Sequence, residues 1–312
     1  MQSELVELAS WLATQGYAFT TATPATHALV NARPGNDVAR DLRGVFGWSR
    51  AFEPALLPDG PVEALRRAGL LREAPGGLLR SAVRYSTLHG QLFAHSAFPT
   101  VEEDAVFFGP DTYRFADLLL QELREQPLPA HGRILDVGCG SGAGGITAAL
   151  ACAVQKPSLV LTDISPRALQ FAAANAAHAG CHDVSFACGD LYAPVSGRFD
   201  FVVANPPYLN DAGKRLYRDG GGRWGEALSV RIVSEGLPRL APGGRLVLYT
   251  GAAIVDGRDP LLEALQPVLQ ASGCTWRYRE LDPDVFGEEL ATSAYSDAER
   301  IAVVALVCSA TG

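Results

Sequence analysis

Short apolar runs alternate with longer amphipathic stretches between residues 105 and 308. The amphipathic stretches have the periodicity of helices, and the apolar runs have the length and composition of buried strands. The pattern predicts helices near 142–154, 166–179, 226–240 and 259–271, and strands at 133–137, 158–162, 183–187, 199–204, 244–249, 274–280 and 301–308.

This alternation predicts an α/β fold built on one sheet. Near-continuous apolar strands separated by helices are typical of a mostly parallel sheet that is covered on both faces. We therefore expect a seven-stranded, doubly wound (Rossmann-like) sheet. Only a loop separates the last two predicted strands, so we expect an antiparallel last strand. Ligands of such sheets bind at the carboxyl ends of the strands.

Residues 1–98 have a different pattern. The segments ELVELASWLATQ (4–15), VARDLRGVFGWSRAF (38–52) and PVEALRRAGLL (61–71) predict helices, and a hairpin is expected around Pro75-Gly76-Gly77. We expect a smaller α+β domain that resembles a degenerate winged helix. The segment SAFPTVEED (96–104) marks the boundary, which gives domains at 1–100 and 101–312.

A winged helix would suggest nucleic-acid binding by the first domain, since its second half is locally basic. The alternative is a substrate-binding or lid domain that packs on the sheet domain. The basic residues are Arg66, Arg67, Arg72, Arg80 and Arg84. The chain as a whole carries a net charge of −8, which favours the substrate-binding or lid domain.

Composition narrows the class of protein further. The chain is 48% hydrophobic, yet no apolar run reaches the roughly 18 residues of a membrane span. The start of the chain lacks the features of a signal peptide. Six cysteines without a dense pattern are typical of reduced thiols, so we expect a cytoplasmic protein without a membrane partner. The cluster His178, Cys181, His182 and Cys188 lacks the spacing of zinc ligands, so no metal is expected.

A glycine-rich loop follows the first strand of the predicted sheet. The sequence ILDVGCGSGAGG (134–145) lets the backbone approach a ligand closely, through Gly138, Gly140 and Gly142. With Gly145, the last two of these glycines also match the dinucleotide pattern G-x-G-x-x-G. However, Asp136 just before the loop would repel a pyrophosphate and favour a cationic ammonium and sulfonium.

Two further carboxylates follow the second and third strands. Asp163 is placed to accept hydrogen bonds from ribose hydroxyls. Its alternative role as a helix cap fits Ser165 better, because Pro166 suits the first helical position. Asp190 is a candidate to bind an adenine amino group, or else a turn aspartate. We include the neighbouring Ile164 and Leu191 in the predicted cofactor site, with the Leu191 side chain packing on the ring.

The fourth strand runs directly into Asn205-Pro206-Pro207-Tyr208. Prolines explain why the strand ends there, but they do not explain the asparagine and the tyrosine beside them. The Asn205 side-chain oxygen and the Pro206 carbonyl could each accept one N–H of a planar –NH2 group. The Tyr208 ring could stack on a planar substrate. We therefore predict catalytic roles for Asn205, Pro206 and Tyr208, with Asn205 also contacting the cofactor.

The chain resembles the class I S-adenosylmethionine-dependent methyltransferases of the Asn-Pro-Pro-Tyr type. Within them it is most similar to the protein-glutamine methyltransferases of peptide release factors. The resemblance covers about residues 105–250. It is carried by FFGPDTYRFADLLL, RILDVGCGSGAGG, LTDISPRALQFAAANA, GDLYAPVSGRFDFVVANPPYL, YRDGGGRWGEAL and LAPGGRLVLYTG. It implies S-adenosylmethionine as cofactor and N-methylation of a planar amine or amide. Related enzymes act on protein glutamine or on nucleobase exocyclic amines.

The acceptor stays open between protein, RNA and a small molecule. The small-molecule alternative includes intramolecular cyclisation of the cofactor to azetidine-2-carboxylate with release of methylthioadenosine. The loop at 209–228 is expected to be a mobile flap over the substrate. The aromatic residues assigned to the pocket are Phe107, Phe108, Tyr113, Tyr217 and Trp224.

Overall fold

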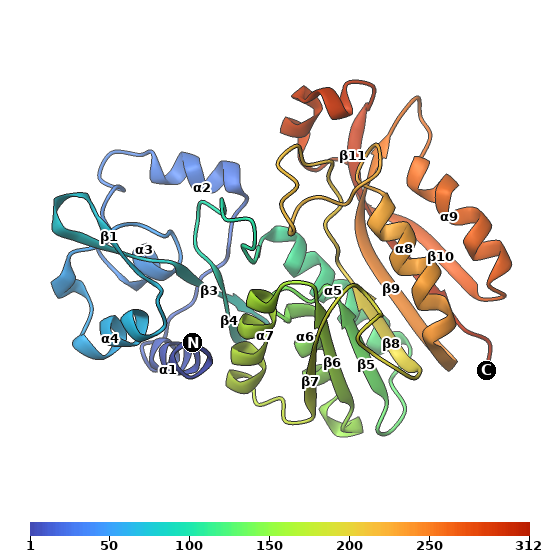
Figure 1. Cartoon of the computed structure of the whole chain (residues 1–312), viewed down its shortest axis with the longest axis horizontal. Coiled ribbons are helices and arrows are strands. Elements are labelled where there is room, and N and C mark those ends of the chain that lie inside the picture. Colours follow the sequence, from blue (N-terminus) through green and yellow to red (C-terminus); the bar gives the residue numbers. More distant parts are fainter.

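A seven-stranded sheet forms the centre of the carboxyl-terminal part in the computed structural model, which describes residues 1–312 (Figure 1). The strand order is β10-β11-β9-β8-β5-β6-β7, and β11 runs antiparallel to both of its neighbours. The predicted fold class is therefore confirmed. The strands are β5 (Arg133–Val137), β6 (Ser158–Asp163), β7 (Val184–Cys188), β8 (Phe199–Ala204), β9 (Leu240–Ile254), β10 (Thr275–Asp282) and β11 (Arg300–Ser309).

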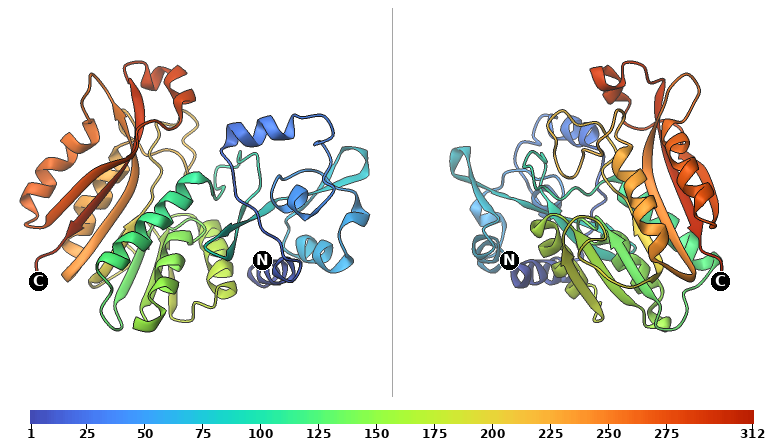
Figure 2. Two further views of the ribbon diagram at one scale, coloured as in Figure 1. Left: turned by 180° about the vertical axis from the view of Figure 1, so that it is seen from behind. Right: turned by 45° about the vertical axis from the view of Figure 1, so that its right-hand side comes forward.

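Helices cover both faces of this sheet, because successive residues of each strand point to opposite faces and both sets are apolar. Ile134 faces a core shared with α5 (Pro110–Glu125), α6 (Ala143–Ala151) and α7 (Pro166–His178). The next residue, Leu135, faces a core shared with α8 (Ala227–Gly236) and α9 (Pro260–Ala271). Figure 2 shows these two groups of helices from behind and after a turn of 45°. Short 3-10 turns lie at Pro54–Leu56, Pro75–Gly77, Ala153–Gln155, Leu237–Arg239, Gly287–Ala291 and Ser293–Tyr295.

The amino-terminal part combines four helices with two separate hairpins. The helices are α1 (Gln2–Thr14), α2 (Pro24–Asn31), α3 (Leu42–Phe46) and α4 (Asp59–Arg67); the strands are β1 (Leu71–Ala74), β2 (Leu78–Ser81), β3 (Val83–Leu88) and β4 (Gln91–Ser96). The β1–β2 hairpin turns at Pro75–Gly77, as predicted. The likeness to a winged helix stays a prediction.

Three local expectations for this part were incomplete. The second hairpin, β3–β4, was missed, although His89 and Gly90 both have the positive φ of a tight hairpin turn. Helix α2 was missed as well, although Thr23 caps it and Pro24 begins it. The stretch 38–52 is helical only at α3, because its two ends pair with each other between Val38 and Ala51 instead.

Helix α7 joins the amino-terminal part to the sheet. Its residues Ala168, Phe171 and Ala174 share a buried core with the leucines of α1. The side chain of Asn175 makes a two-way bond with the backbone of β4: Ala94 N donates to Oδ1 at 2.7 Å, and Nδ2 donates to Ala94 O at 3.0 Å. Nδ2 also donates to Ser141 O in the glycine loop at 2.9 Å. One amide therefore links the hairpin, the helix and the loop.

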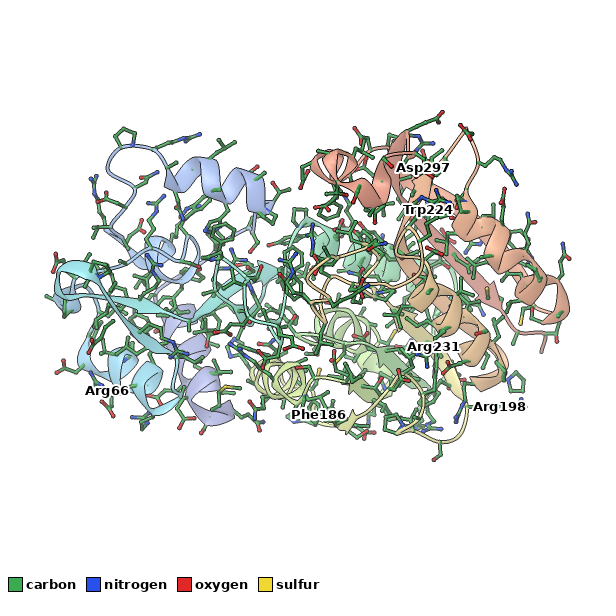
Figure 3. The ribbon with its side chains drawn as sticks, turned by 45° about the horizontal axis from the view of Figure 1, so that its top comes forward. Arg66, Phe186, Arg198, Trp224, Arg231 and Asp297 are labelled. Atoms are coloured by element: carbon green, nitrogen blue, oxygen red, sulfur yellow. The ribbon has the colours of Figure 1, made fainter.

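The basic stretch predicted in the amino-terminal part does not form one open cationic face. Arg84 is 3% exposed and lies 3.2 Å from His27 Nδ1. Burial lowers the pKa of Arg84 to about 10. Arg67 pairs with Glu7 at 2.7 Å, and Arg66, on the outer surface in Figure 3, pairs with Glu63. These contacts weaken the nucleic-acid alternative for this domain.

The structure contains neither a membrane-spanning helix nor a metal-binding cluster. No helix combines the length and the apolar character that crossing a membrane would require. No group of three or more His, Cys, Asp or Glu side chains is arranged to hold a metal ion.

Asn175→Ala should lower the free energy of unfolding by about 2–4 kcal/mol, because it leaves buried backbone groups without partners. Urea denaturation would measure the change. The control is Asn36→Ala, which removes a single side-chain bond to Val30 O near the surface and should cost less than about 1 kcal/mol. Equal costs for the two variants would contradict the linking role of Asn175.

Candidate active site

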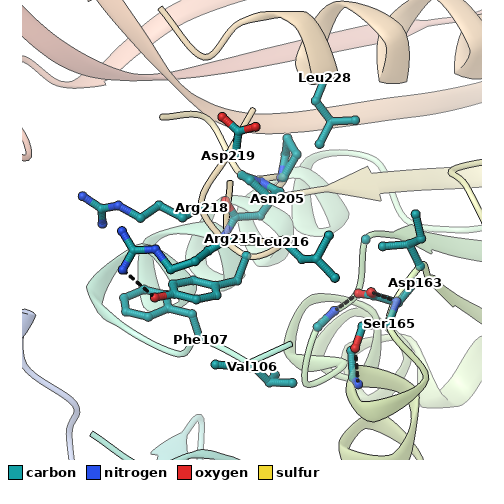
Figure 4. A pocket seen from close by; sticks show the side chains of 18 of the residues that line it. Val106, Phe107, Asp163, Ser165, Asn205, Arg215, Leu216, Arg218, Asp219 and Leu228 are labelled. Carbon is teal, nitrogen blue, oxygen red and sulfur yellow. Dashed lines mark hydrogen bonds between the residues drawn. The ribbon is translucent and has the colours of Figure 1, made fainter. Parts of the chain in front are cut away.

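A cavity of about 340 Å³ opens at the carboxyl ends of β5, β6 and β8 (Figure 4). The chain runs from β5 outward through β6 and β7 and then crosses to β8 on the other side of β5. Such a reversal leaves a crevice above the sheet where ligands bind. The volume falls within the usual range of small-molecule sites.

The glycine loop forms the floor of this cavity. Gly138 and Gly140 line it with φ of 68° and 53°, and a Cβ at Gly138 would meet only open space. Gly142 does not line the cavity; its φ is 78° and a Cβ there would lie 2.9 Å from Ile146. Thus the first two glycines expose backbone to a ligand, whereas the third lets the loop pack on α6.

Asp136 lies beneath the loop rather than in the cavity. It is 2% exposed, and its Oδ2 accepts a hydrogen bond from Gly145 N at 2.7 Å. Burial raises the pKa of Asp136 to about 7, with a smaller contribution from the charge of Asp163. The structure therefore assigns Asp136 to holding the shape of the loop, and direct contact with the cofactor stays a prediction.

Asp163 lines the cavity and holds the loop from the neighbouring strand. Its two oxygens accept hydrogen bonds from Gly140 N at 2.9 Å and Ser165 N at 2.8 Å. Burial raises the pKa of this carboxyl. Ser165 caps α7 by accepting from Ala168 N at 3.3 Å, as the sequence suggested. Ile164 also lines the cavity and is 55% exposed, so its side chain is available to a ligand.

Asp190 and Leu191 lie at the far end of the same wall. Leu191 is almost fully buried and has a φ of 46°. Asp190 pairs with Arg231 of α8 at 2.9 Å, and both side chains are about half exposed. An exposed ion pair contributes roughly 0–1 kcal/mol, so a ligand can replace it at small cost.

Asn205 lies at the end of β8 with its side chain at the cavity (Figure 4). Neither its side-chain oxygen nor the Pro206 carbonyl accepts a hydrogen bond from the protein. Pro206 and Tyr208 also line the cavity. The Tyr208 hydroxyl is already engaged, because it donates to Asp111 Oδ2 at 2.7 Å. Asp111 also lines the cavity but was not predicted as a site residue. Its position directly after Gly109-Pro110, at the start of a helix, was the sequence feature that could have indicated it.

The loop after Tyr208 closes the cavity from above. The Tyr217 ring stacks on the Phe107 ring, with 6.1 Å between the ring centroids and 13° between the ring planes. The Tyr217 hydroxyl donates to Thr100 O at 2.7 Å. The Asp211 carboxylate forms ion pairs with two arginines of the loop: Arg215 Nε donates to Oδ2 at 2.9 Å, and Arg218 Nε lies 3.3 Å from Oδ1. These contacts hold the loop over the cavity; its role as a mobile flap stays a prediction. The other loop residues at the cavity were not predicted; they are Leu209, Lys214, Arg215, Leu216, Arg218 and Asp219.

Three of the five predicted pocket aromatics lie elsewhere. Phe108 is fully buried and stacks on His95 at 4.9 Å. Tyr113 faces the amino-terminal part, where its hydroxyl accepts from Thr21 N at 2.9 Å. Trp224 does not line the cavity; it is partly buried against the cluster that contains Tyr208 and Tyr295, and its Nε1 donates to Asp297 at 3.2 Å (Figure 3).

Comparison with known proteins agrees with this geometry. The family model described as "Methyltransferase small domain" matches residues 100–254. A release factor glutamine methyltransferase of Bordetella pertussis is 31% identical over 219 residues, which cover 66% of this chain and 78% of that protein. The chain belongs to the release factor glutamine methyltransferase family. The family relation confirms the predicted resemblance and the predicted cofactor.

A second relative in this family matches over a smaller share of its length. The release factor glutamine methyltransferase of Deinococcus radiodurans is 37% identical over 187 residues, which are 58% of this chain and 63% of that protein. The chain thus spans less than two thirds of that relative. Among solved structures, Trm5b from Pyrococcus abyssi aligns with a TM-score of 0.51 at 13% identity, covering 78% of this chain and 62% of that one. This likeness supports the fold alone.

Asp136→Asn should change how stability depends on pH. The Asp136 carboxyl keeps its proton up to about pH 7 in the folded state but loses it near pH 3.9 when unfolded. Its contribution to stability is therefore complete below about pH 4 and is lost as the pH rises through 7.

The free energy of unfolding of the wild type, relative to that of the Asn variant, should fall by up to about 4 kcal/mol between pH 4 and pH 7, and then level off. Urea denaturation of both proteins at several pH values from 4 to 8 would measure this. A difference that stays constant with pH would contradict a raised pKa for Asp136.

Proposed function

We propose that this protein transfers the methyl group of S-adenosylmethionine to the side-chain amide nitrogen of a glutamine in a protein, and that this protein is a release factor. The observation that carries the proposal is the pair of free acceptors at Asn205 and Pro206, placed at the switch point of the sheet beside the glycine loop. The relatives' shared activity supports the choice of glutamine.

The residues at the cavity fit S-adenosylmethionine. Gly138 exposes its backbone to the cavity, and a side chain at this position would project into the space that a ligand needs. This open backbone suits the methionyl end of the molecule. Asp163 suits the ribose hydroxyls, and Asp190 with Leu191 suits the adenine ring and its amino group. When bound, the cofactor supplies a methyl group on a positively charged sulfur.

Asn205 and Pro206 act on the acceptor. An amide nitrogen is a poor nucleophile, because its lone pair is conjugated with the carbonyl. Two oxygen acceptors that each take one N–H hold this nitrogen and direct its lone pair at the methyl carbon. Such positioning can account for roughly 7–11 kcal/mol of a barrier. The oxygens also stabilise the positive charge that develops on the nitrogen.

The amino-terminal domain, residues 1–100, is proposed as the substrate and lid domain of the enzyme, and residues 101–312 as the catalytic domain. Pro24 at the start of α2 is the only residue before 100 that lines the cavity. The carbonyl oxygen of Thr100, at the boundary between the two proposed domains, accepts a hydrogen bond from the Tyr217 hydroxyl of the loop over the cavity. A cytoplasmic location is proposed as well, since all six cysteines are free thiols.

The decisive experiment is incubation of the purified protein with S-adenosylmethionine, with and without a bacterial release factor. Mass spectrometry of the release factor and of the nucleoside products gives the result. We expect one added methyl group on a glutamine, with S-adenosylhomocysteine formed only when the release factor is present. Methylthioadenosine formed from the cofactor alone would instead support cyclisation, which the family relation does not favour.

Asn205→Ala should lower kcat about 10²-fold and leave the Kd for S-adenosylmethionine nearly unchanged, because the loss is in positioning of the acceptor. Asn205→Asp keeps an acceptor oxygen at the same place and should retain more activity than the Ala variant. Steady-state kinetics with the release factor and calorimetric titration of the cofactor would measure both effects. Full turnover by Asn205→Ala would overturn the role of Asn205.

A further inference from the structure

The carboxylate of Asp111 is the meeting point of two buried tyrosines. Asp111 lies in the first turn of α5 and is 7% exposed. Its Oδ2 accepts from the Tyr208 hydroxyl at 2.7 Å, and its Oδ1 accepts from the Tyr249 hydroxyl at 2.8 Å. Arg114 lies 3.3 Å from Oδ1 and balances the charge. Both oxygens of this buried acid are thus occupied by donors from other elements.

Both tyrosines act as donors in this cluster. Burial raises the pKa of Tyr208 and of Tyr249, and the negative charge of Asp111 raises each of them further. The phenols therefore stay protonated at any working pH. Hydrogen bonds from a neutral donor to a charged acceptor are stronger than those between neutral groups, so each phenol is firmly held.

The ring of Tyr208 has only one place to lie. A Cβ at Gly251 would come within 2.3 Å of the ring, so the absence of a side chain there creates the slot. Phe286 closes the slot with an edge contact at 5.9 Å between ring centroids. A Cβ at Gly225 would come within 2.1 Å of the Tyr208 carbonyl oxygen, so the backbone is enclosed as well.

We propose that Asp111 is a positioning residue for methyl transfer, which fixes Tyr208 and, through the stiff Pro206-Pro207 pair, the side chain of Asn205. The inference rests on the proposed function of the same site. In this arrangement Tyr208 anchors the turn and does not serve as a stacking surface for the acceptor. Tyr249, on β9, orients the same carboxylate without being connected to the turn.

The two tyrosines supply a matched pair of variants. Tyr208→Phe and Tyr249→Phe each remove one hydroxyl from the same carboxylate and leave the ring in place. We expect Tyr208→Phe to lower kcat about 10–100-fold, with the Kd for S-adenosylmethionine changed less than about twofold, because misplacement of about 1 Å can cost 10²-fold. Tyr249→Phe should keep kcat within about threefold of the wild type. Equal losses of kcat in the two variants, or full activity in Tyr208→Phe, would overturn the proposal.

A double-mutant cycle tests whether Asp111 acts through Tyr208. Asp111→Ala should lower kcat as Tyr208→Phe does, and the double variant should be no slower than Asp111→Ala alone. Asp111→Asn can still pair with Tyr208 and should recover part of the lost rate. Losses in kcat that multiply in the double variant would mean that the two residues act separately.

Hydrogen exchange separates a failure of this inference from a failure of the proposed function. Backbone amides at 208–211 should exchange faster in Tyr208→Phe than in Tyr249→Phe, whatever the acceptor is. If the wild type methylates no release factor but this difference is found, the anchor stands and the proposed acceptor is wrong. If methylation is found but the two variants exchange alike, the anchor is wrong.

Discussion

The floor of the active site depends on two buried carboxylates that hold the glycine loop from below. Asp136 accepts Gly145 N, and Asp163 accepts Gly140 N, each within 3 Å. These bonds set the path of the chain between β5 and α6, and they satisfy amides that would otherwise lack partners. Burial of the two acids disfavours their charged forms, so the loop geometry is obtained at an electrostatic cost.

The roof of the site is built differently. It depends on contacts between segments that lie far apart in the chain, such as Tyr208 with Asp111 and Tyr217 with Thr100. Arg218 also reaches Glu289, in the segment between β10 and β11. The floor is thus fixed by contacts around the ends of the neighbouring strands β5 and β6, whereas the roof is assembled from several loops. A division of this kind is typical of sites in which covering loops move while the binding floor stays fixed.

The same division explains what the sequence could predict. The strands of the sheet, the Ser165 cap and the cavity positions of Gly138, Asp163 and Asn205 follow from short-range patterns, and the structure agrees. Strand β9 is longer than predicted at both ends, because Leu240 pairs with Phe199 of β8 and β11 pairs with β9 as far as Ile254. The positions of Phe108 and Trp224, and the link between Asp111 and Tyr208, could not be predicted. They depend on which loops meet, and Asp111 and Tyr208 are 97 residues apart.

Asn175 has a consequence for how this protein can be divided. The segment at 96–104 looks like a linker, but a fragment that begins at residue 101 would expose the Phe171 side chain and leave the Asn175 amide without Ala94. The Asn175 side chain would then be less restrained, and its hydrogen bond to Ser141 O would weaken. That bond is the only contact that the amide makes with the glycine loop. The two parts therefore do not behave as interchangeable modules: an amino-terminal part taken from another relative would have to bring a strand edge that fits α7.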